Sequence, residues 1–433
     1  MFNPRILYSA MLWLLLPYVF FHLLWRARKQ PEYLHHIGER FGFYPRRSSK
    51  PVIWLHTVSV GETRAAANLI RRLQQNYPDH QLLLTHTTPT GRAASEQLYG
   101  DSVMRVYLAY DYPFAVQRFL SHFRPRIGVL LETEIWFNLI HACHSGQIPL
   151  VLLNARLSEK SSAGYGRYPN LTRTGLAKLS AVAAQSADDA ARLTALGANN
   201  VVVMGNLKFD IAPPLAMQQL GQQLRDRFGA KRKIFLAAST REGEEALLLP
   251  VLQQADIPDL LTVIVPRHPQ RFDAVAALLG RAGVRFQRRS ENAVIAAETQ
   301  VVLGDSMGEL FAYYTACDIA YIGGSLLPFG GQNLIEACAV GKPAIIGPHT
   351  YNFTQASEQA VAGGAAIRVQ DAPSLLTTLN NLFSEPDRIT EMGRAGRRFV
   401  DANRGATERS LQYITNFLRR TEGLTAKPGE APD

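Results

Sequence analysis

The sequence predicts an α/β protein with two doubly wound parallel sheets, preceded by an apolar N-terminal helix. Short runs rich in Val, Ile and Leu alternate with segments of helical period in two separate stretches of the chain. Residues 213–232, between these stretches, have a proline pair, a Gln-rich segment and a basic run, and no strand pattern. Two such domains facing each other across a cleft suit an enzyme that brings two substrates together.

The N-terminal apolar run is long enough to cross a bilayer. Residues 6–25 contain no Asp, Glu, Lys or Arg, and a membrane-spanning helix needs ~20 apolar residues. Basic residues at 26–29 follow the run, whereas a cleaved signal has its positive charge in front. We therefore expect residues 1–30 to be an uncleaved membrane anchor with the rest of the chain in the cytoplasm, adding little to either core. Pro17 and His22 interrupt the run and leave a monotopic interfacial helix as the alternative.

The first domain is predicted over residues 31–212. The helix expected at residues 63–77 places Ala66, Leu69, Ile70 and Leu73 on one face. The expected strands are short apolar runs that begin at Val52, Gln81, Ile127, Pro149 and Val201.

The second domain is predicted over residues 233–421, after the interdomain linker at 213–232. A polar tail, residues 422–433, is expected to be disordered. The strands of this domain are expected in the runs that begin at Lys233, Leu261, Thr299, Asp318 and Pro343.

The charge balance indicates an anionic partner. The formal net charge is +10, which favours nucleic acid, phospholipid or a phosphorylated substrate without choosing among them. The basic connector at residues 26–50 follows the anchor, so anionic phospholipid headgroups explain it more simply than nucleic acid does. Cys143, Cys317 and Cys338 lie far apart, which suits a reduced compartment.

Acidic and basic residues follow the predicted strands of the first domain. Glu62 opens the helix after the first strand and is a candidate general base, although the helix dipole alone favours a carboxylate there. Glu132 and Glu134 follow the strand that begins at Ile127, where they either orient an acceptor or belong to a helix N-terminus. Lys208 lies near the linker and is either a site residue or a solvated surface charge.

The second domain has features typical of phosphate binding. Arg267 and His268 end a predicted strand, where they can bind a phosphate or simply cap a loop. The amides of Met307, Gly308 and Glu309 lie at a strand-to-helix turn. In GGSLLPFGGQNLIEA, residues 330–333 are expected to open a helix whose free amides bind an anion, with Glu336 on the ribose hydroxyls.

Several other site types are excluded by the sequence. It has no GxxxxGK[ST], GxSxG, HExxH or CxxC motif. The histidines at 35–36 and at 141 and 144 lack a third ligand at useful spacing. No metal site is therefore expected.

Eight motifs in one order resemble the Kdo transferase family, the 3-deoxy-D-manno-oct-2-ulosonic acid (Kdo) transferases of lipopolysaccharide assembly. The motifs are HTVSVGETRAA, TPTGR, ETEIWFN, NARLS, GNLKFD, PRHPQRF, GDSMGEL and GGQNLIEA. The resemblance implies a GT-B glycosyltransferase, anchored at the inner membrane, that transfers Kdo from CMP-Kdo to the lipid A precursor (lipid IVA). It places the acceptor on the first domain and the nucleotide on the second.

The resemblance also implies roles for individual residues. Glu62 is the proton acceptor, and Glu132 and Lys208 stabilise the transition state. No metal or other cofactor is expected, because Arg267 and a helix N-terminus can neutralise the single phosphate of CMP. Gln332 stands where many relatives have His, Ala337 where several have Pro, and Arg241 where His is commoner, so a role for Arg241 is in doubt. The implied CMP contacts are Arg267, His268, Met307, Gly308, Glu309, Asn333, Leu334, Ile335 and Glu336.

Two other functions fit the same pattern. A nucleotide-sugar epimerase also pairs two doubly wound domains, but it needs no membrane anchor. A membrane-tethered nucleotide-binding scaffold without catalysis would reduce Glu62 to a helix-capping acid. Only the transferase would release CMP together with a Kdo-modified lipid.

Overall fold

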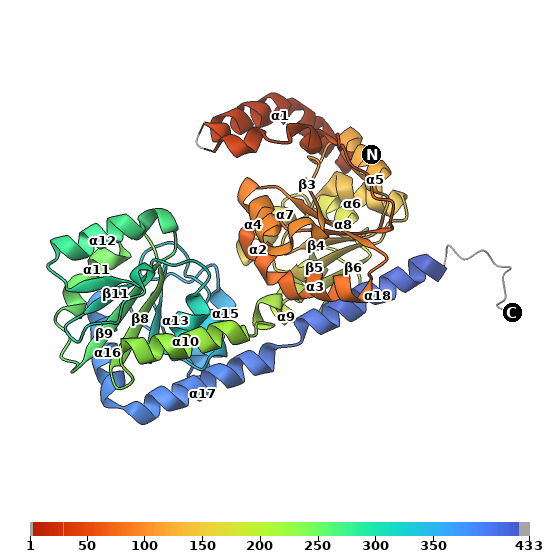
Figure 1. Ribbon diagram of the computed structural model, residues 1–433. Coiled ribbons are helices and arrows are strands. Elements are labelled where there is room, and N and C mark those ends of the chain that lie inside the picture. The colour runs from red at the N-terminus through yellow and green to blue at the C-terminus, as the bar shows by residue number, and fades with distance from the viewer. Residues whose placement is uncertain (1–2, 29, 424–433) are drawn as a thin grey trace. The chain divides into compact units, whose positions relative to one another are not determined.

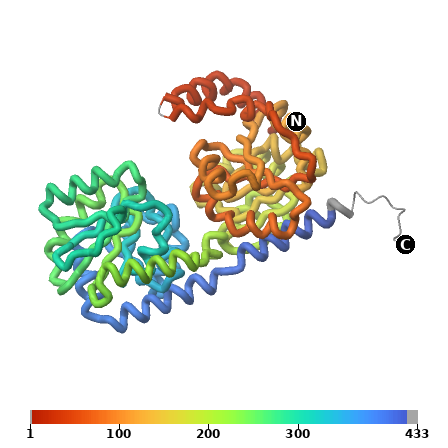
Figure 2. Tube along the Cα trace, viewed as in Figure 1, coloured from red at the N-terminus to blue at the C-terminus, as the bar shows by residue number. Residues whose placement is uncertain are grey.

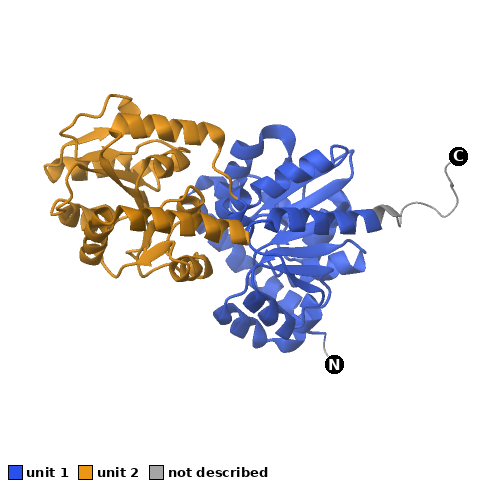
Figure 3. Cartoon of the chain, turned by 90° about the horizontal axis from the view of Figure 1, so that it is seen from below, with its two compact units in different colours: residues 1–210, 404–433 blue, residues 211–403 orange. Residues whose placement is uncertain are grey.

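The computed structural model describes residues 3–28 and 30–423, with side chains described to residue 420 (Figure 1). The chain forms two compact units (Figure 3). Unit 1 comprises residues 1–210 and 404–433, and unit 2 comprises residues 211–403. The trace passes from unit 1 into unit 2 and returns to unit 1 near its C-terminal end (Figure 2).

Unit 1 contains a seven-stranded parallel sheet with the strand order β3-β2-β1-β4-β5-β6-β7. Its central strands are buried on both faces, as parallel strands covered by helices must be. The sequence predicted five of these strands and missed the short β3 and β6. The strands are β1 (Val52–His56), β2 (Gln81–His86), β3 (Met104–Tyr107), β4 (Pro125–Leu131), β5 (Leu150–Ala155), β6 (Ala181–Ala184) and β7 (Val201–Val203).

The first helix after β1 is divided into two. It begins at Val60 and breaks at Ala66, while Leu69, Ile70 and Leu73 are fully buried as their spacing predicted. The helices of unit 1 are α1 (Pro4–Ala27), α2 (Val60–Ala65), α3 (Ala67–Asn76), α4 (Pro89–Tyr99), α5 (Pro113–Phe123), α6 (Phe137–Ser145), α7 (Glu159–Gly166), α8 (Pro169–Leu176), α9 (Ala187–Ala195) and α18 (Ala406–Gly423). Its 3-10 turns are η1 (Pro31–Leu34), η2 (Ile37–Phe41), η3 (Gly100–Ser102) and η4 (Leu207–Phe209).

Unit 2 contains a second seven-stranded parallel sheet, with the order β10-β11-β9-β8-β12-β13-β14. The sequence predicted five of these strands and missed β10 and β14, which have three residues each. The strands are β8 (Lys233–Thr240), β9 (Leu260–Pro266), β10 (Phe286–Arg288), β11 (Val301–Leu303), β12 (Ile319–Ile322), β13 (Ala344–Ile346) and β14 (Ala366–Arg368). The helices are α10 (Leu215–Phe228), α11 (Glu244–Leu252), α12 (Phe272–Arg281), α13 (Leu310–Ala316), α14 (Ile335–Ala339), α15 (Thr354–Ala362), α16 (Ala372–Ser384) and α17 (Pro386–Asn403), with 3-10 turns η5 (Pro269–Arg271) and η6 (Arg289–Glu291).

The unit boundaries differ from the expected domain boundaries at both ends of unit 2. Helix α10 occupies the expected linker and packs against α13, where a Cβ on Gly221 would lie 2.4 Å from Cβ of Thr315. Helix α18, expected in the second domain, packs on α3 and β4 of unit 1, and its Ile414 and Leu418 are fully buried there. Glu422 and Gly423 end α18, and the rest of the expected disordered tail lies outside the described residues.

Helix α1 packs on unit 1, contrary to the expectation that the apolar run adds little to a core. Tyr8, Leu12 and Leu16, spaced at i, i+4 and i+8, lie against the core of unit 1. The Tyr8 hydroxyl donates to Asp111 Oδ2 at 2.9 Å, and the Tyr8 ring meets Phe137 edge-on. The remaining apolar side chains are largely exposed, and α1 is long and apolar enough to cross a membrane by length and composition.

Candidate active site

Glu62 is held at the start of α2 by the loop that follows β1. Ser59 caps the helix, and its hydroxyl donates to Glu62 Oε1 at 2.9 Å. The Val58 amide donates to Glu62 Oε2 at 2.7 Å. This Ser-x-x-Glu arrangement resembles a capping box, so the local structure alone accounts for the position of the carboxylate. The pKa of this carboxyl group, however, is not explained by helix capping.

The Glu62 carboxyl group has a strongly perturbed pKa. Burial is the main cause, and the charge of Glu132 adds to it, raising the pKa from 4.5 to about 7. Hydrogen bonds from Val58 and Ser59 oppose the shift without cancelling it. A carboxyl group with this pKa is close to half ionised at neutral pH, which suits a general base.

Glu132 lies directly after β4, beside the loop that bears Glu62. In the β1–β4 pairing His56 is in register with Leu130, so the two strands end at the same edge of the sheet. Glu132 has a left-handed backbone with φ of 59°, which is uncommon for a residue other than glycine. Lys208 Nζ donates to Glu132 Oε1 at 3.0 Å, and both side chains are about one-fifth exposed (18% and 23%). The structure thus brings together Glu62, Glu132 and Lys208, whereas the sequence pattern alone did not decide whether Lys208 is a site residue or a surface charge.

A polar network that sequence reasoning missed positions the turn bearing Lys208. Asn154 Oδ1 accepts from the Leu207 amide at 3.1 Å. Gln185 Nε2 donates to the Asn154 carbonyl at 2.9 Å, and Asn206 Nδ2 donates to Gln185 Oε1 at 3.0 Å. Asn154 belongs to the NARLS motif, whereas Gln185 has no motif that would have revealed it.

His56 and Glu134 complete the polar edge of unit 1. His56 Nε2 lies 3.7 Å from Glu134 Oε2, and Trp136 Nε1 donates to the same oxygen at 2.7 Å. His56 is fully buried, and its Nδ1 lies 3.0 Å from the Thr85 carbonyl. The sequence analysis did not single out His56, although its place at the end of β1 in HTVSVGET was the available signal.

In unit 2, Arg267 and His268 follow β9 at the carboxyl edge of the sheet. Arg267 Nε donates to Gln332 Oε1 at 3.2 Å, which joins the loop after β9 to the loop after β12. Burial, Arg241 and Arg267 lower the pKa of His268, which favours the neutral form of this imidazole. Arg241 lies with its guanidinium 4.4 Å from the Phe329 ring centroid, also next to the Gly-rich loop.

The turn after β11 holds Met307, Gly308 and Glu309. Gly308 has φ of 81°, and Glu309 precedes the first residue of α13. The Glu309 carboxylate is engaged, because Ser306 Oγ donates to it at 2.7 Å and Arg289 Nε lies 3.3 Å away. The backbone of this turn and the exposed Met307 side chain therefore remain to meet a ligand.

The Gly-rich loop after β12 corrects one prediction. Residues 330–333 do not open a helix, because α14 begins at Ile335. The Gly331 amide donates to the Gly324 carbonyl at 2.7 Å and the Gln332 amide to Gly323 at 2.9 Å, so neither is free for an anion. The φ values of 88° at Gly330 and 73° at Gly331 fold the loop back on itself instead of starting a helix.

The remaining predicted CMP contacts lie where this loop enters α14. Leu334 and Ile335 have buried side chains, which leaves their backbone as the part able to contact a nucleotide. Asn333 Oδ1 accepts from the Ile335 amide at 3.1 Å, and Asn333 Nδ2 donates to Glu336 Oε1 at 3.2 Å. Glu336 is half-buried beside them.

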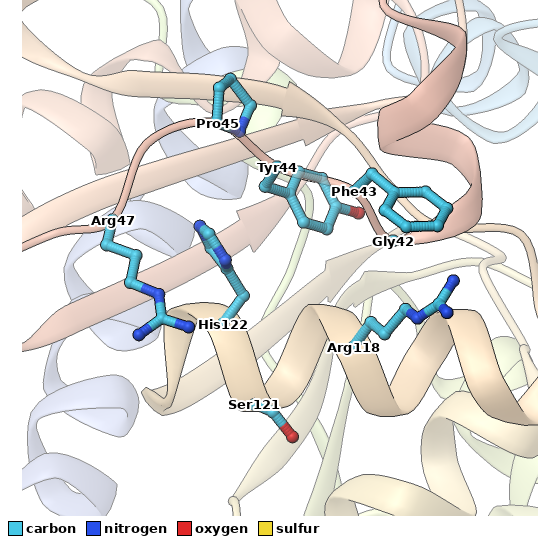
Figure 4. Close-up of a pocket in the computed structure, with 8 residues that line it drawn as sticks. All are labelled: Gly42, Phe43, Tyr44, Pro45, Arg47, Arg118, Ser121 and His122. Carbon is cyan, nitrogen blue, oxygen red and sulfur yellow. The ribbon is translucent and has the colours of Figure 1, made fainter.

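A basic hollow of about 600 Å³ lies elsewhere on unit 1 (Figure 4). It is formed by residues 42–45 and Arg47 and by Arg118, Ser121 and His122 of α5, and none of the predicted site residues lines it. The Arg118 guanidinium stacks over Phe43 at 4.3 Å from the ring centroid. Within the described ranges, no group of three or more His, Cys, Asp and Glu side chains could hold a metal ion.

Two α/β units, each with a seven-stranded parallel sheet, form a fold of the GT-B type, and this fold resembles that of a solved glycosyltransferase from Rickettsia africae. That match has a TM-score of 0.58 and 15% identity, and it covers 88% of this chain and all of the other. The family model described as 3-deoxy-D-manno-octulosonic-acid transferase (kdotransferase) matches residues 35–211. A 3-deoxy-D-manno-octulosonic acid transferase of Bordetella pertussis is 42% identical over 88% of this chain and 91% of its own length. The corresponding transferase of Haemophilus influenzae is 37% identical over 96% and 99%. The chain belongs to the Kdo transferase family, as its motifs predicted, and it is a glycosyltransferase.

Proposed function

We propose that this enzyme transfers Kdo from CMP-Kdo to the lipid A precursor, with Glu62 as the catalytic base. The observation that carries the proposal is the buried Glu62 carboxyl group, whose pKa is raised to about 7 beside Glu132 and Lys208. Family membership supports the reaction class and argues against an epimerase or a scaffold without catalysis.

The reaction is an inverting displacement at the anomeric carbon. The acceptor hydroxyl attacks from the face opposite CMP, and its proton passes to Glu62 as the new C–O bond forms. The bond from the anomeric carbon to the phosphate oxygen breaks, and CMP leaves with the electron pair. The Lys208–Glu132 ion pair lies at the same sheet edge, where it stabilises charge that develops in the transition state.

Unit 2 supplies the CMP site in this proposal. Arg267 offers its guanidinium to the single phosphate, and the neutral His268 offers a hydrogen bond. The backbone of Met307, Gly308 and Glu309 and the residues from Asn333 to Glu336 contact the rest of the nucleotide. CMP leaves with a single phosphate group that carries two negative charges, and Arg267 with the backbone amides of this site would stabilise them without a divalent metal or another cofactor.

A direct assay tests the proposal. The full-length protein is incubated with CMP-Kdo and a tetra-acylated lipid A precursor, and the products are separated by mass. The expected result is free CMP together with a lipid heavier by Kdo. CMP release without modified lipid, or no turnover of CMP-Kdo, would overturn the proposal.

We further propose that α1 and the basic hollow of Figure 4 hold the enzyme on anionic phospholipid at the cytoplasmic face of the inner membrane. Trp13 stacks on Phe114 at 5.5 Å, and Arg118 lies 5.3 Å from the same Phe114 ring, so helix and hollow are continuous. The stripe of α1 from Tyr8 to Leu16 packs on the protein, which supports a helix lying in the interface with its other face in lipid.

A further inference from the structure

Arg40, at the end of η2, is a buried cation without an acidic partner. The residue is 2% exposed, and its Nη1 donates to the Thr87 carbonyl at 3.1 Å. Its Nε and Nη2 have no hydrogen-bond partner, and no carboxylate of residues 3–28 or 30–420 forms an ion pair with it. The guanidinium stacks on Tyr107, 4.1 Å from the ring centroid, and also lies 5.7 Å from the Tyr110 ring centroid, where it interacts with the Tyr110 hydroxyl. Burying an unpaired guanidinium is unfavourable, and an anionic ligand would offset that cost.

The Arg40 guanidinium lies at the N-terminus of α4. Thr87, which accepts its hydrogen bond, precedes the N-cap residue Thr88. The helix has 11 residues and begins at Pro89, so the amide of the exposed Thr90 has no acceptor within the helix. The partial positive charge of this helix end and the Arg40 guanidinium therefore favour an anion at the same place.

Arg92 brings a second guanidinium to this helix end. Its guanidinium lies 5.0 Å from the Tyr107 ring that Arg40 also stacks on. It pairs with the buried Glu39 at 2.8 Å, and Glu39 also accepts from the Tyr107 amide at 2.7 Å. Glu39 thus pairs with Arg92 and not with Arg40, which leaves the cluster with an excess positive charge.

This cluster adjoins the proposed catalytic base. Thr88 Oγ1 donates to the Val58 carbonyl at 2.9 Å, and the Val58 amide donates to Glu62 Oε2 at 2.7 Å. The contact is close, since a Cβ on Gly91 would lie 2.8 Å from the Val58 carbonyl oxygen. An anion at the start of α4 would therefore belong to a molecule bound next to Glu62.

We propose that Arg40, Arg92 and the first turn of α4 form a subsite for a phosphate group of the acceptor. The inference rests on the proposed function. A lipid A precursor carries phosphate monoesters on its sugars, and Glu62 would take a proton from a hydroxyl group of the same molecule. Two guanidinium groups and a helix N-terminus suit a dianionic phosphate. Thr90 and Arg92 are the parts of the subsite that are open to solvent, and the buried Arg40 adds its positive charge to theirs.

The test compares acceptors with and without phosphate. Wild type and Arg40→Gln are assayed with a bisphosphorylated tetra-acyl acceptor and with each of its two monophosphoryl forms. Wild type is expected to lose about one to two orders of magnitude in kcat/KM on one monophosphoryl form, the range of a charge-assisted contact. On the bisphosphorylated acceptor, Arg40→Gln is expected to have a kcat/KM lower than wild type by the same factor. On the monophosphoryl form that wild type uses poorly, the variant and wild type should differ little. The KM for CMP-Kdo should be unchanged.

Arg420→Gln is the matched control, since Arg420 also lies over an aromatic ring of unit 1, 5.9 Å from the Phe417 ring centroid, but belongs to α18 and has no proposed role. It should keep the wild-type preference among the acceptors. Equal losses of Arg40→Gln on all three acceptors would make Arg40 a structural residue and overturn the inference.

Inorganic phosphate gives a second measurement that does not depend on how well Arg40→Gln folds. It should inhibit wild type competitively with the acceptor, and absence of that competition would also overturn the inference. If wild type transferred Kdo to none of the acceptors, the proposed function itself would fail, which is a different outcome.

Discussion

Replacing Glu62 by Gln separates a catalytic base from a helix-capping acid. The substitution keeps the shape of the side chain and removes its ability to take a proton at neutral pH. A positioned general base contributes ~10² to 10⁴ in rate, so turnover should fall by about that factor. Binding of CMP, measured by calorimetry, should be unchanged because the proposed nucleotide contacts are in unit 2.

The raised pKa adds a stability signature to this substitution. A rise from 4.5 to about 7 corresponds to ~3 kcal/mol at 1.36 kcal/mol per pKa unit. Because the folded-state pKa lies above the unfolded one, the contribution to stability is full below pH 4.5 and is lost as pH rises through about 7. Glu62→Gln stays neutral, so its stability relative to wild type should improve between pH 5 and pH 8 by up to ~3 kcal/mol.

A capping acid of ordinary pKa behaves differently. Its substitution by Gln would lower the free energy of unfolding by a few tenths of a kcal/mol to ~1 kcal/mol. This loss would not depend on pH between pH 5 and pH 8. Denaturant unfolding at pH 5 and pH 8 measures the difference, and a CMP-release assay measures turnover.

The pH dependence of kcat/KM of the wild-type enzyme is a second measurement of the Glu62 pKa. Its kcat/KM should rise with pH through an inflection near 7, since Glu62 must be ionised to act as a base. Glu159→Gln is the control, because Glu159 is an exposed carboxylate of unit 1 with no proposed role, and this variant should keep the wild-type inflection. Near-wild-type turnover of Glu62→Gln, or a flat pH profile from 6 to 8, would refute the reasoning and move the base role to Glu132 or Glu134.

Three further predictions follow from the same geometry. Glu132→Gln should move the inflection of the pH profile to lower pH, because the charge of Glu132 is the second cause of the raised Glu62 pKa. An inflection at the wild-type pH would show that the two carboxyl groups are not coupled. Arg267→Ala should raise the KM for CMP-Kdo by roughly one to two orders of magnitude, as the loss of a charge-assisted contact of ~1.5 to 3 kcal/mol predicts, whereas an unchanged KM would make Arg267 structural. Removing residues 1–30 should weaken membrane binding and also lower the melting temperature of unit 1. Asp111 would lose its hydrogen bond from the Tyr8 hydroxyl, and Phe137 would lose its contact with the Tyr8 ring. An unchanged melting temperature would contradict the packing of α1 on unit 1.

Hydrophobic pattern determined the architecture and much of the candidate site. The central strands of both sheets are continuous apolar runs, and buried parallel strands have this signature in any sequence. Their order along the chain also predicted that Glu62 and Glu132 follow strands at the carboxyl edge of the first sheet. The pattern left Lys208 open as a site residue or a surface charge, and only the family resemblance gave it a role. The strands that were missed, such as β10 and β14, have three residues each, too few for a period to be recognised.

Only the tertiary structure decided the features that depend on contacts between distant residues. Helix α18 has an ordinary amphipathic pattern, and nothing in that pattern says that its apolar face packs on unit 1 instead of unit 2. The raised pKa of Glu62 arises from burial and from a carboxylate 70 positions away in the chain. The Gly-rich loop folds back on Gly323 and Gly324 because its amides find carbonyls there, a choice that local glycine content cannot make. Sequence periodicity reports which face of an element is apolar, whereas the partner of that face, and the electrostatic environment it creates, exist only once the chain has folded.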